Sequence, residues 1–391
     1  MSASGLYDES EMLTVIPKKF LINRQLLVKY RCCQCPGKLV TCERPPRIKP
    51  GSSYSDAFII DVALSKYCDL IPIERYCSIA GRSGFKGLPQ NSLIELTHYL
   101  AHFLEPLLDI IKQEVLDALI LYADETPHKM LESKKKLWYL WGFSSDSACF
   151  FYVDKSRSGD VAHGFLSKAS CEILLTDVYS AYGKAVRLAN DFRKQENLKL
   201  IIQAFCNAHA RRRFVEINGN EGQFFIDSYE KIYGLEKLAK EAMTVDSDIG
   251  HLRQARDAMK PIFDEMKSEA TKLLDQFSSK SSQVRAAKYF IDNFDGLILC
   301  LDDLRLRLDN KVQEGLFRSP VVGRKTWHGN HSVLGAKTTT TLHTVVECCK
   351  LNKVNPRKYI PDVVKSIHVN KEILTPSRYR QIQLSKSDPP H

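Results

Sequence analysis

Hydrophobic residues gather in five short stretches between residues 118 and 205, each six to eight residues long and bounded by polar or turn-forming residues. This pattern is typical of β-strands. The first three stretches follow one another directly, and a helical pattern over 179–192 separates the last two. Such an order predicts an α/β fold whose mixed five-stranded sheet is flanked by helices. The predicted strands are 118–124, 137–143, 148–154, 172–177 and 198–205.

Helical periodicity dominates the rest of the chain. From Ser92, apolar residues recur every three or four positions, and Ser92 with Glu95 has the spacing of a capping box. Pro106 predicts a kink in this helix. The same periodicity over 214–300 predicts an all-helical insertion. After it we predict a loop beyond Gly323, a helix around Thr340–Leu351 and a disordered basic tail.

The charge of the chain is unevenly spread. Its 391 residues include 56 Lys or Arg and 46 Asp or Glu, and residues 16–50 hold nine basic residues and one acid. Such a stretch suits nucleic-acid phosphates, because each neutralised phosphate releases counterions. A solvated surface explains the charge equally well on its own. Because no apolar run approaches the roughly 18 residues that cross a bilayer and the amino terminus lacks a signal-peptide pattern, we expect an intracellular soluble protein without membrane contact.

The twelve cysteines do not predict a secreted disulfide framework, and we expect most of them to be reduced and buried. Cys32 and Cys35 have the spacing of one half of a zinc site. A structural zinc ion needs four ligands, and the residues before Cys32 include no second Cys or His pair. Cys42 lies nearby but does not complete the set. We therefore keep Cys32 and Cys35 as a partial zinc site, and zinc binding stays open.

Two aspartates come directly after apolar strands. Asp124 ends the first predicted strand and Asp177 ends the fourth, so both carboxylates are expected at carboxyl ends of strands. Taken singly, each aspartate fits a helix cap or a turn. On neighbouring strands the two carboxylates would repel each other, and a divalent cation is the usual remedy. Mg²⁺ prefers such oxygen ligands, and a pair of ions promotes phosphodiester chemistry.

Glu314 is the best candidate for a third acid. Asn310 and Gln313 resemble a helix start, which places Glu314 and Arg318 four residues apart on one helical face. In isolation these two residues predict only a surface ion pair.

Five motifs, in order, make the chain similar to a known family. The segments YADET, LLTDVYSAY, CNAHARRRF, the residues around Glu314 and VVGRKTWHGN together resemble the transposases of the insertion sequence 66 family. The resemblance extends from about residue 28 to residue 375. It implies a ribonuclease-H-like fold and the acid-triad (DDE) class of DNA transposases. The implied activity is metal-dependent cleavage of DNA at the ends of the element and strand transfer into target DNA.

The resemblance also implies functional residues. Asp124, Asp177 and Glu314 match the catalytic acids, which hold two Mg²⁺ or Mn²⁺ ions, and their gaps of 53 and 137 residues accommodate a helical insertion before the glutamate. Cys206 and His209 match a Cys-x-x-His signature that lies between the second and third acids. From the residues alone, this pair is either two zinc ligands or a buried structural pair, and we favour the structural role.

The implied partners are double-stranded DNA, as the terminal inverted repeats and the target, a further copy of the chain in a synaptic complex, and accessory proteins of the element. Basic residues in or near the motifs are assigned to DNA binding. They are Arg157, Arg211, Arg212, Arg213, Arg318, Arg324 and Lys325.

The chain departs from the family pattern at two places. Only the second half of the amino-terminal zinc-binding region is present, and Lys311 and Gly315 replace a typical Asn and Arg beside Glu314. The alternative is therefore a truncated, non-catalytic DNA-binding remnant.

The chain is predicted to divide into six regions. They are a basic remnant of a zinc- and DNA-binding region (1–44), a linker with a helical DNA-binding region (45–116), the first part of the catalytic core (117–214), the helical insertion (215–300), the second part of the core (301–335) and a helical segment with a basic tail (336–391).

Overall fold

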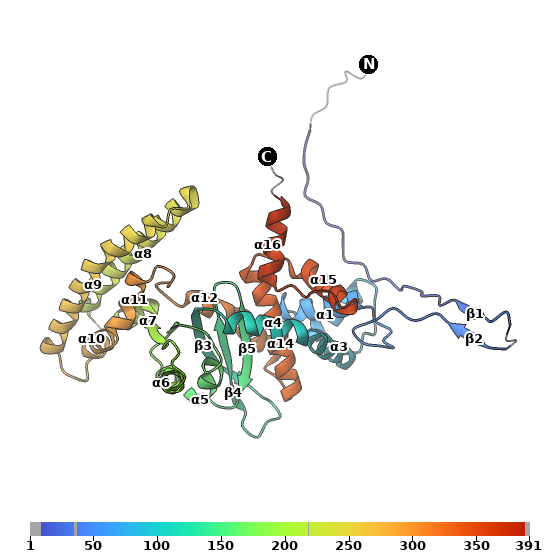
Figure 1. Cartoon of the computed structure of the whole chain (residues 1–391), viewed down its shortest axis with the longest axis horizontal. Coiled ribbons are helices and arrows are strands. Elements are labelled where there is room, and N and C mark those ends of the chain that lie inside the picture. The colour runs from blue at the N-terminus through green and yellow to red at the C-terminus, as the bar shows by residue number, and fades with distance from the viewer. Residues whose placement is uncertain (1–8, 35–36, 218, 388–391) are drawn as a thin grey trace, which may run out of the picture.

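The computed structural model describes residues 9–34, 37–217 and 219–387. A five-stranded sheet lies at its centre, and helices distant in sequence surround the sheet (Figure 1). In the view of Figure 1, the helical insertion lies to the left of the sheet, and helices from both ends of the chain lie to its right. The structure thereby separates into a sheet with two helical flanks.

The sheet consists of β3 (Ile120–Lys129), β4 (Leu137–Ser144), β5 (Cys149–Asp154), β6 (Ile173–Thr176) and β7 (Ile202–Phe205). Its strand order is β5-β4-β3-β6-β7. β4 pairs antiparallel with both β3 and β5, whereas β6 pairs parallel with both β3 and β7. This arrangement confirms the prediction of a mixed five-stranded sheet in which three consecutive strands precede a strand–helix–strand alternation.

Alternate residues of the central strand face two separate cores, because successive side chains of a strand point to opposite faces. Leu121 and Ala123 belong to a core shared with helices from both ends of the chain, whereas Tyr122 packs with the helical insertion. Asp124 therefore faces the side of the insertion. Glu125 faces the opposite side.

The first core is covered by α1 (Asp56–Tyr67), α2 (Ile73–Arg82), α3 (Gln90–Phe103), α4 (Glu105–Leu116), α5 (Gly159–Leu166), α6 (Ser180–Gln195), α13 (Arg318–Trp327), α14 (Val333–Leu351), α15 (Pro356–His368) and α16 (Pro376–Ser387). Among these helices, α14 packs against β5 and against α1 and α3. The two ends of the chain are thus joined on one face of the sheet.

The insertion is helical, as its periodicity predicted. A continuous apolar stripe on its longest helix, from Leu252 to Leu273, is buried against the other helices. The elements are α7 (Asn207–Val215), a 3-10 turn (Asn220–Gly222), α8 (Gln223–Asp246), α9 (Gly250–Gln276), α10 (Ser282–Asp292) and α11 (Phe294–Asp302), after which α12 (Lys311–Leu316) returns to the sheet.

The start of α3 differs from its prediction. The helix begins at Gln90, directly after Pro89, and no side chain caps it. The predicted capping box is therefore wrong. Instead of reaching back to the helix start, the Glu95 carboxylate pairs with Lys49 at 2.9 Å.

The predicted kink at Pro106 is a complete break. α3 ends at Phe103, and α4 begins two residues later with Pro106 in its first turn. A proline is well tolerated there, because the amide hydrogens of a first turn have no partner within the helix. One continuous helix would have lost a hydrogen bond at this position.

The carboxyl-terminal region is more helical than predicted. Residues 324–327 complete α13, so the short loop expected beyond Gly323 begins later and covers residues 328–332. α14 begins well before Thr340, because the Ser332 hydroxyl accepts a hydrogen bond from the backbone N–H of Gly335 at 3.1 Å and caps the helix. Much of the predicted disordered tail forms two helices, α15 and α16, which both pack on α14.

The basic amino-terminal region contains a short hairpin of β1 (Lys29–Arg31) and β2 (Leu39–Thr41), which projects from the rest of the chain in Figure 1. Cys32 follows β1 and is exposed, and Cys35 lies outside the described residues. Within the described ranges, no helix is both long enough and apolar enough to cross a bilayer.

Candidate active site

Asp124 lies where β3 leaves its parallel neighbour. The ladder between β3 and β6 ends at Tyr122 and Leu175, and β6 ends one residue later. Asp177 follows immediately. The two aspartates therefore emerge at the same end of the parallel ladder. The prediction that the first strand ends at Asp124 is wrong, because β3 continues to Lys129 in its pairing with β4.

The helix that carries Glu314 is fastened to two strands. Asn310, the residue before α12, donates a hydrogen bond from its side chain to the carbonyl oxygen of Ala123 at 3.0 Å. This carbonyl adjoins Asp124. The backbone N–H of Asn310 donates to Sγ of Cys206, at the end of β7, at 3.2 Å. The start of α12 is thus held next to the first candidate acid.

The predicted pairing of Glu314 with Arg318 is wrong. α12 ends at Leu316 and Arg318 begins α13, so the two side chains do not share one helical face. In the described part of the chain no ion pair joins them. Oε1 of Glu314 lies instead 3.7 Å from Nδ1 of His209.

Gly142 on β4 leaves the room that α12 needs. A Cβ at this position would lie 2.5 Å from Nε2 of Gln313 and 2.8 Å from ring atoms of both Phe151 and Phe317. We expect Gly142→Ala to destabilise the protein by about 1–3 kcal/mol, because two rings in a packed core cannot move independently. The displaced helix should also carry the third candidate acid away from the sheet.

The matched control is Gly234→Ala in α8, where an added Cβ meets no atom within 4 Å. Alanine stabilises a helix interior relative to glycine by roughly 0.5–1 kcal/mol, so this variant should be no less stable than wild type. Urea unfolding compares the two variants. Equal stability would contradict the close docking of α12 over Gly142.

Two of the candidate acids, Asp177 and Glu314, act on the carboxyl group of the third, Asp124. Burial raises the pKa of Asp124, and the negative charges of Glu125, Asp177 and Glu314 raise it further, to about 8. The backbone N–H of Glu125 donates to Oδ1 of Asp124 at 2.9 Å and opposes this shift. Clustered carboxylates of this kind offer the hard oxygen ligands that suit Mg²⁺ or Mn²⁺. The donor set therefore fits a hard divalent cation.

Asp124 is expected to make the metal-free protein less stable as pH rises from about 4 towards 8. Its pKa of about 8 in the folded protein exceeds the ordinary value of about 3.9. The folded state therefore holds the proton more tightly than the unfolded chain, and the free energy of unfolding falls over this range. With EDTA present, the Tm of Asp124→Asn should rise relative to wild type between about pH 5 and pH 8. A constant difference in Tm would contradict the raised pKa.

Glu125 is a buried acid that was not predicted from the sequence. It accepts hydrogen bonds from Nε of Arg157 at 2.8 Å and from the hydroxyl of Tyr182 at 2.6 Å. Arg157 also stacks on Tyr179, with 4.1 Å from the guanidinium carbon to the ring centre. Burial raises the pKa of Glu125, and Tyr182 and Arg157 oppose that shift. The sequence does contain a signal for this buried acid, because Glu125 directly follows Asp124 on the same strand. Successive residues of a strand point to opposite faces, so Glu125 enters the opposite core from Asp124.

A second group of potential ligands adjoins the acids. Cys206 is buried at the start of α7, and Sγ of Cys206, a ring nitrogen of His209 and a carboxylate oxygen of Glu314 all lie within 4.8 Å of one another. Among the described residues, no other set of three or more His, Cys, Asp or Glu is this compact. Asp124 and Asp177 therefore lie outside the tight group that contains Glu314.

Comparison with known families decides what kind of protein this is. The model of the family described as "Transposase IS66 family" matches residues 51–338, which is most of the chain. The chain belongs to this family. The resemblance predicted from the motifs is thus confirmed, and membership implies a protein that binds DNA and an enzyme that cleaves or transfers it.

Similar proteins occur in Sinorhizobium fredii. The uncharacterized protein y4jD is 25% identical over 374 residues, which cover 92% of this chain and 71% of the relative. The uncharacterized protein y4hP is 24% identical over 386 residues, covering 92% of this chain and 68% of the relative. The uncharacterized protein y4qI is 26% identical over 376 residues, with the same two coverages.

The first group of basic residues in this transposase lies on α7 and comprises Arg211, Arg212 and Arg213. Arg211 approaches Glu230 at 3.7 Å, and Arg212 is exposed. Arg213 lies over the ring of Tyr289 at 5.2 Å. Burial raises the pKa of Tyr289, and so does the charge of Asp177. Arg213 and the second candidate acid therefore both act on Tyr289, with opposite effects on its pKa.

The second group of basic residues lies on α13. Arg318 and Lys325 are exposed, and Arg324 is half-buried. Burial lowers the pKa of His128, and the charge of Arg324 lowers it further. Since His128 comes four residues after Asp124 on β3, the charge of Arg324 acts on the continuation of the central strand.

An open cavity of about 500 Å³ lies near the sheet end of the aspartates, although none of the three candidate acids lines it. Arg157 and Tyr179 line it, so it borders both the Glu125 pair and the loop after Asp177. Two further cations, Lys184 and Arg187, line the same cavity, and Lys184 is paired with Asp160 at 2.8 Å. The cavity is a positively lined surface next to the sheet end that carries the aspartates.

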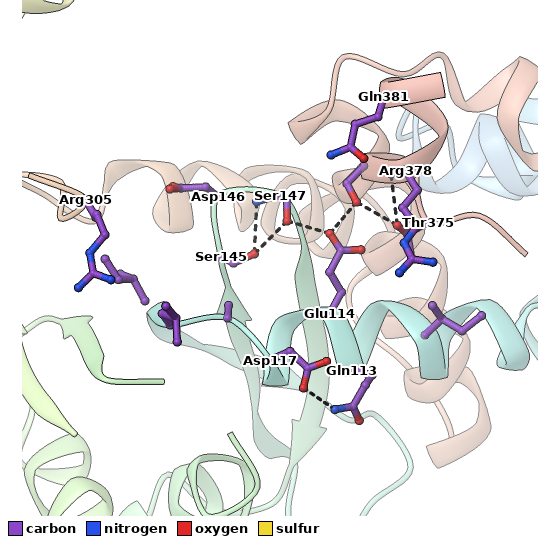
Figure 2. A pocket seen from close by; sticks show the side chains of 15 residues that line it. Gln113, Glu114, Asp117, Ser145, Asp146, Ser147, Arg305, Thr375, Arg378 and Gln381 are labelled. Carbon is purple, nitrogen blue, oxygen red and sulfur yellow. Dashed lines mark hydrogen bonds between the residues drawn. The ribbon is translucent and has the colours of Figure 1, made fainter. Parts of the chain in front are cut away.

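A larger cavity, of about 660 Å³, lies at the opposite end of the sheet. Figure 2 shows Glu114 within it, with its carboxylate directed towards Ser147. Oε1 of Glu114 accepts hydrogen bonds from the hydroxyls of Ser147 at 2.8 Å and Ser377 at 2.6 Å. None of the three candidate acids lines this cavity, so its size does not identify the active site.

Proposed function

We propose that this transposase is a DDE enzyme with a ribonuclease-H-like core, which cleaves DNA at the ends of an insertion sequence and transfers the strand into target DNA. One observation carries the proposal. Asp124 and Asp177 emerge at the same end of a parallel ladder, and Asn310 fastens the helix of Glu314 beside Asp124. The sheet order, with three antiparallel strands followed by two parallel ones, supports the proposed core.

Asp124, Asp177 and Glu314 would hold two Mg²⁺ or Mn²⁺ ions. When bound, these ions activate the attacking oxygen and stabilise the leaving oxygen of the phosphodiester. The chain itself supplies the positions of the ligands. β3 pairs with β6 up to Tyr122 and with β4 from Tyr122 onwards, so the β4 pairing includes Asp124 and fixes the first aspartate. The contact between Arg157 and Glu125 braces β3 at the next residue.

The cations around this sheet end suit a DNA backbone. We propose that phosphates lie along the cavity lined by Arg157 and Arg187 and along the exposed arginines of α7, because guanidinium groups bind phosphate oxygens bidentately. Phosphates bound in this way would fix the position of the terminal repeats and of the target DNA with respect to the three candidate acids. Joining two ends requires at least two bound ends, so we propose a homo-oligomeric synaptic complex, with accessory proteins of the element as further partners.

Metal-dependent cleavage of an oligonucleotide that carries the end of the element tests the proposal. The sequence that flanks the reading frame supplies that end as an inverted repeat. We expect cleavage with Mg²⁺ or Mn²⁺, none with EDTA, and joining of the cleaved strand to a second duplex. A scrambled oligonucleotide of the same length is the matched control.

The other outcomes of this experiment separate the alternatives. Binding that falls steeply with salt but never leads to cleavage would indicate a non-catalytic remnant. Equal cutting of the scrambled duplex without strand joining would indicate a general nuclease. Either result would contradict the proposed transposition reaction.

A further inference from the structure

Three potential metal ligands from two separate segments converge beside the proposed catalytic acids. Cys206 precedes α7 and His209 lies in its first turn, three residues later, so the two side chains share one side of the helix. Glu314 comes from α12. The backbone N–H of Asn310 donates to Sγ of Cys206 at 3.2 Å, which holds the sulfur against the start of α12. The group is therefore part of the packing that positions Glu314.

Two atoms of this group are buried and have no hydrogen-bond partner among the residues that the structure describes. They are Nδ1 of His209 and Oε1 of Glu314, which lie 3.7 Å apart. An unsatisfied buried polar group costs about 1–3 kcal/mol, and a ligand shared by both atoms would remove that cost. The two side chains are still 25% and 33% exposed, so an ion can reach them from solvent.

We propose that Cys206, His209 and Glu314 form a binding site for a zinc-class divalent ion. Thiolate and imidazole ligands select Zn²⁺ over Mg²⁺, and three protein ligands leave one tetrahedral position for water or substrate. On binding, the Cys206 thiol exchanges its proton, which goes to solvent, for a bond from sulfur to the metal. The proposal assigns a ligand role to the pair for which the sequence favoured a structural one.

The proposed site shares one carboxylate with the proposed function, and this consequence rests on that function. Glu314 is the third acid of the DDE set and also the third ligand of the zinc-class site. A zinc-class ion would hold Glu314 with Cys206 and His209. We therefore expect Zn²⁺ to inhibit Mg²⁺-dependent cleavage by withdrawing this carboxylate.

Co²⁺ is the probe for the site, because a bond between thiolate and Co²⁺ gives a charge-transfer band in the near ultraviolet. One equivalent of Co²⁺ should produce this band, and Cys206→Ser should abolish it. His209→Gln should weaken Co²⁺ binding by at least about tenfold, since even groups that only orient metal ligands contribute that much. The background is the full chain with four amino-terminal cysteines replaced by Ser: Cys32, Cys33, Cys35 and Cys42.

Cys171→Ser is the matched control. Burial raises the pKa of Cys171 to about 11, as it does for Cys206, but Cys171 lies outside the ligand group. This variant should keep the band. A band that survives in Cys206→Ser, or a folded background protein that binds no Co²⁺, would overturn the site. If circular dichroism shows that Cys206→Ser does not fold, unchanged Co²⁺ affinity in His209→Gln overturns the site instead.

The inhibition is measured by adding micromolar Zn²⁺ to cleavage reactions in millimolar Mg²⁺. Each protein is compared with its own rate in Mg²⁺ alone. The concentration of Zn²⁺ that halves the rate should rise at least about tenfold in His209→Gln, in line with the loss of affinity. Equal inhibition of both proteins would refute the shared carboxylate. A protein that shows the Co²⁺ band but never cleaves DNA would contradict the proposed function and leave the metal site standing.

Discussion

Replacing Asp124 with Asn is expected to reduce metal-dependent DNA cleavage by at least about 10³-fold, the scale of losses seen when one member of a catalytic unit is removed. The substitution keeps the shape of the side chain but removes the charged oxygen that would hold a metal ion. DNA binding should be largely retained, because loss of a negative charge beside a phosphate cannot weaken attraction to it. Cleavage of an end-bearing oligonucleotide measures the first effect, and an electrophoretic mobility shift measures the second.

The matched control for this variant is Asp146→Asn. Asp146 borders the same sheet at its opposite end, where it is exposed and pairs with Arg307 at 2.7 Å. This control should retain cleavage. Unchanged strand transfer in Asp124→Asn would refute the assignment of Asp124. Joint loss of cleavage and DNA binding would indicate a folding defect, which circular dichroism would reveal.

The strand pattern predicted the sheet well because each strand has one or two buried faces. Residues of β6 and β4 are buried along nearly their whole length, so their sequences are continuous apolar runs. Helix ends were predicted less well. At Pro106 and at Ser332, more than one position of the helix end is compatible with the local sequence. Which position is adopted depends on packing against neighbouring elements, and the pattern of apolar residues does not identify those neighbours.

Of the candidate site, the sequence pattern located the two aspartates but not the contacts that bring the glutamate to them. Asp124 and Asp177 follow apolar runs and are visible locally. Glu314 depended on the family resemblance, since its place is set by contacts across more than a hundred residues, such as Asn310 with Ala123. Hydrophobic periodicity carries no information on such polar contacts, and the same reason explains why Glu125 was overlooked.

The helical insertion also depends on a polar contact that its periodicity does not reveal. Arg256 of α9, only 1% exposed, donates from Nε and Nη2 to the two carboxylate oxygens of Glu236 in α8, each at 2.8 Å. The same guanidinium donates to the carbonyl oxygens of Cys300 at 2.6 Å and Leu306 at 3.2 Å. Arg256 therefore fixes the segment that leads from the insertion back to α12 and Glu314.

Arg256→Met is expected to destabilise the protein by about 3–5 kcal/mol, because among the described residues it leaves the buried Glu236 carboxylate with the exposed Lys240 as its remaining ion-pair partner. Cleavage should fall as well, since the segment before Glu314 loses two anchors. The matched control is Lys260→Met on the same helix, whose side chain is exposed and whose loss should change the stability by no more than about 0.5 kcal/mol. Urea unfolding measures both variants. Equal stability would show that the buried pair does not hold the insertion in place.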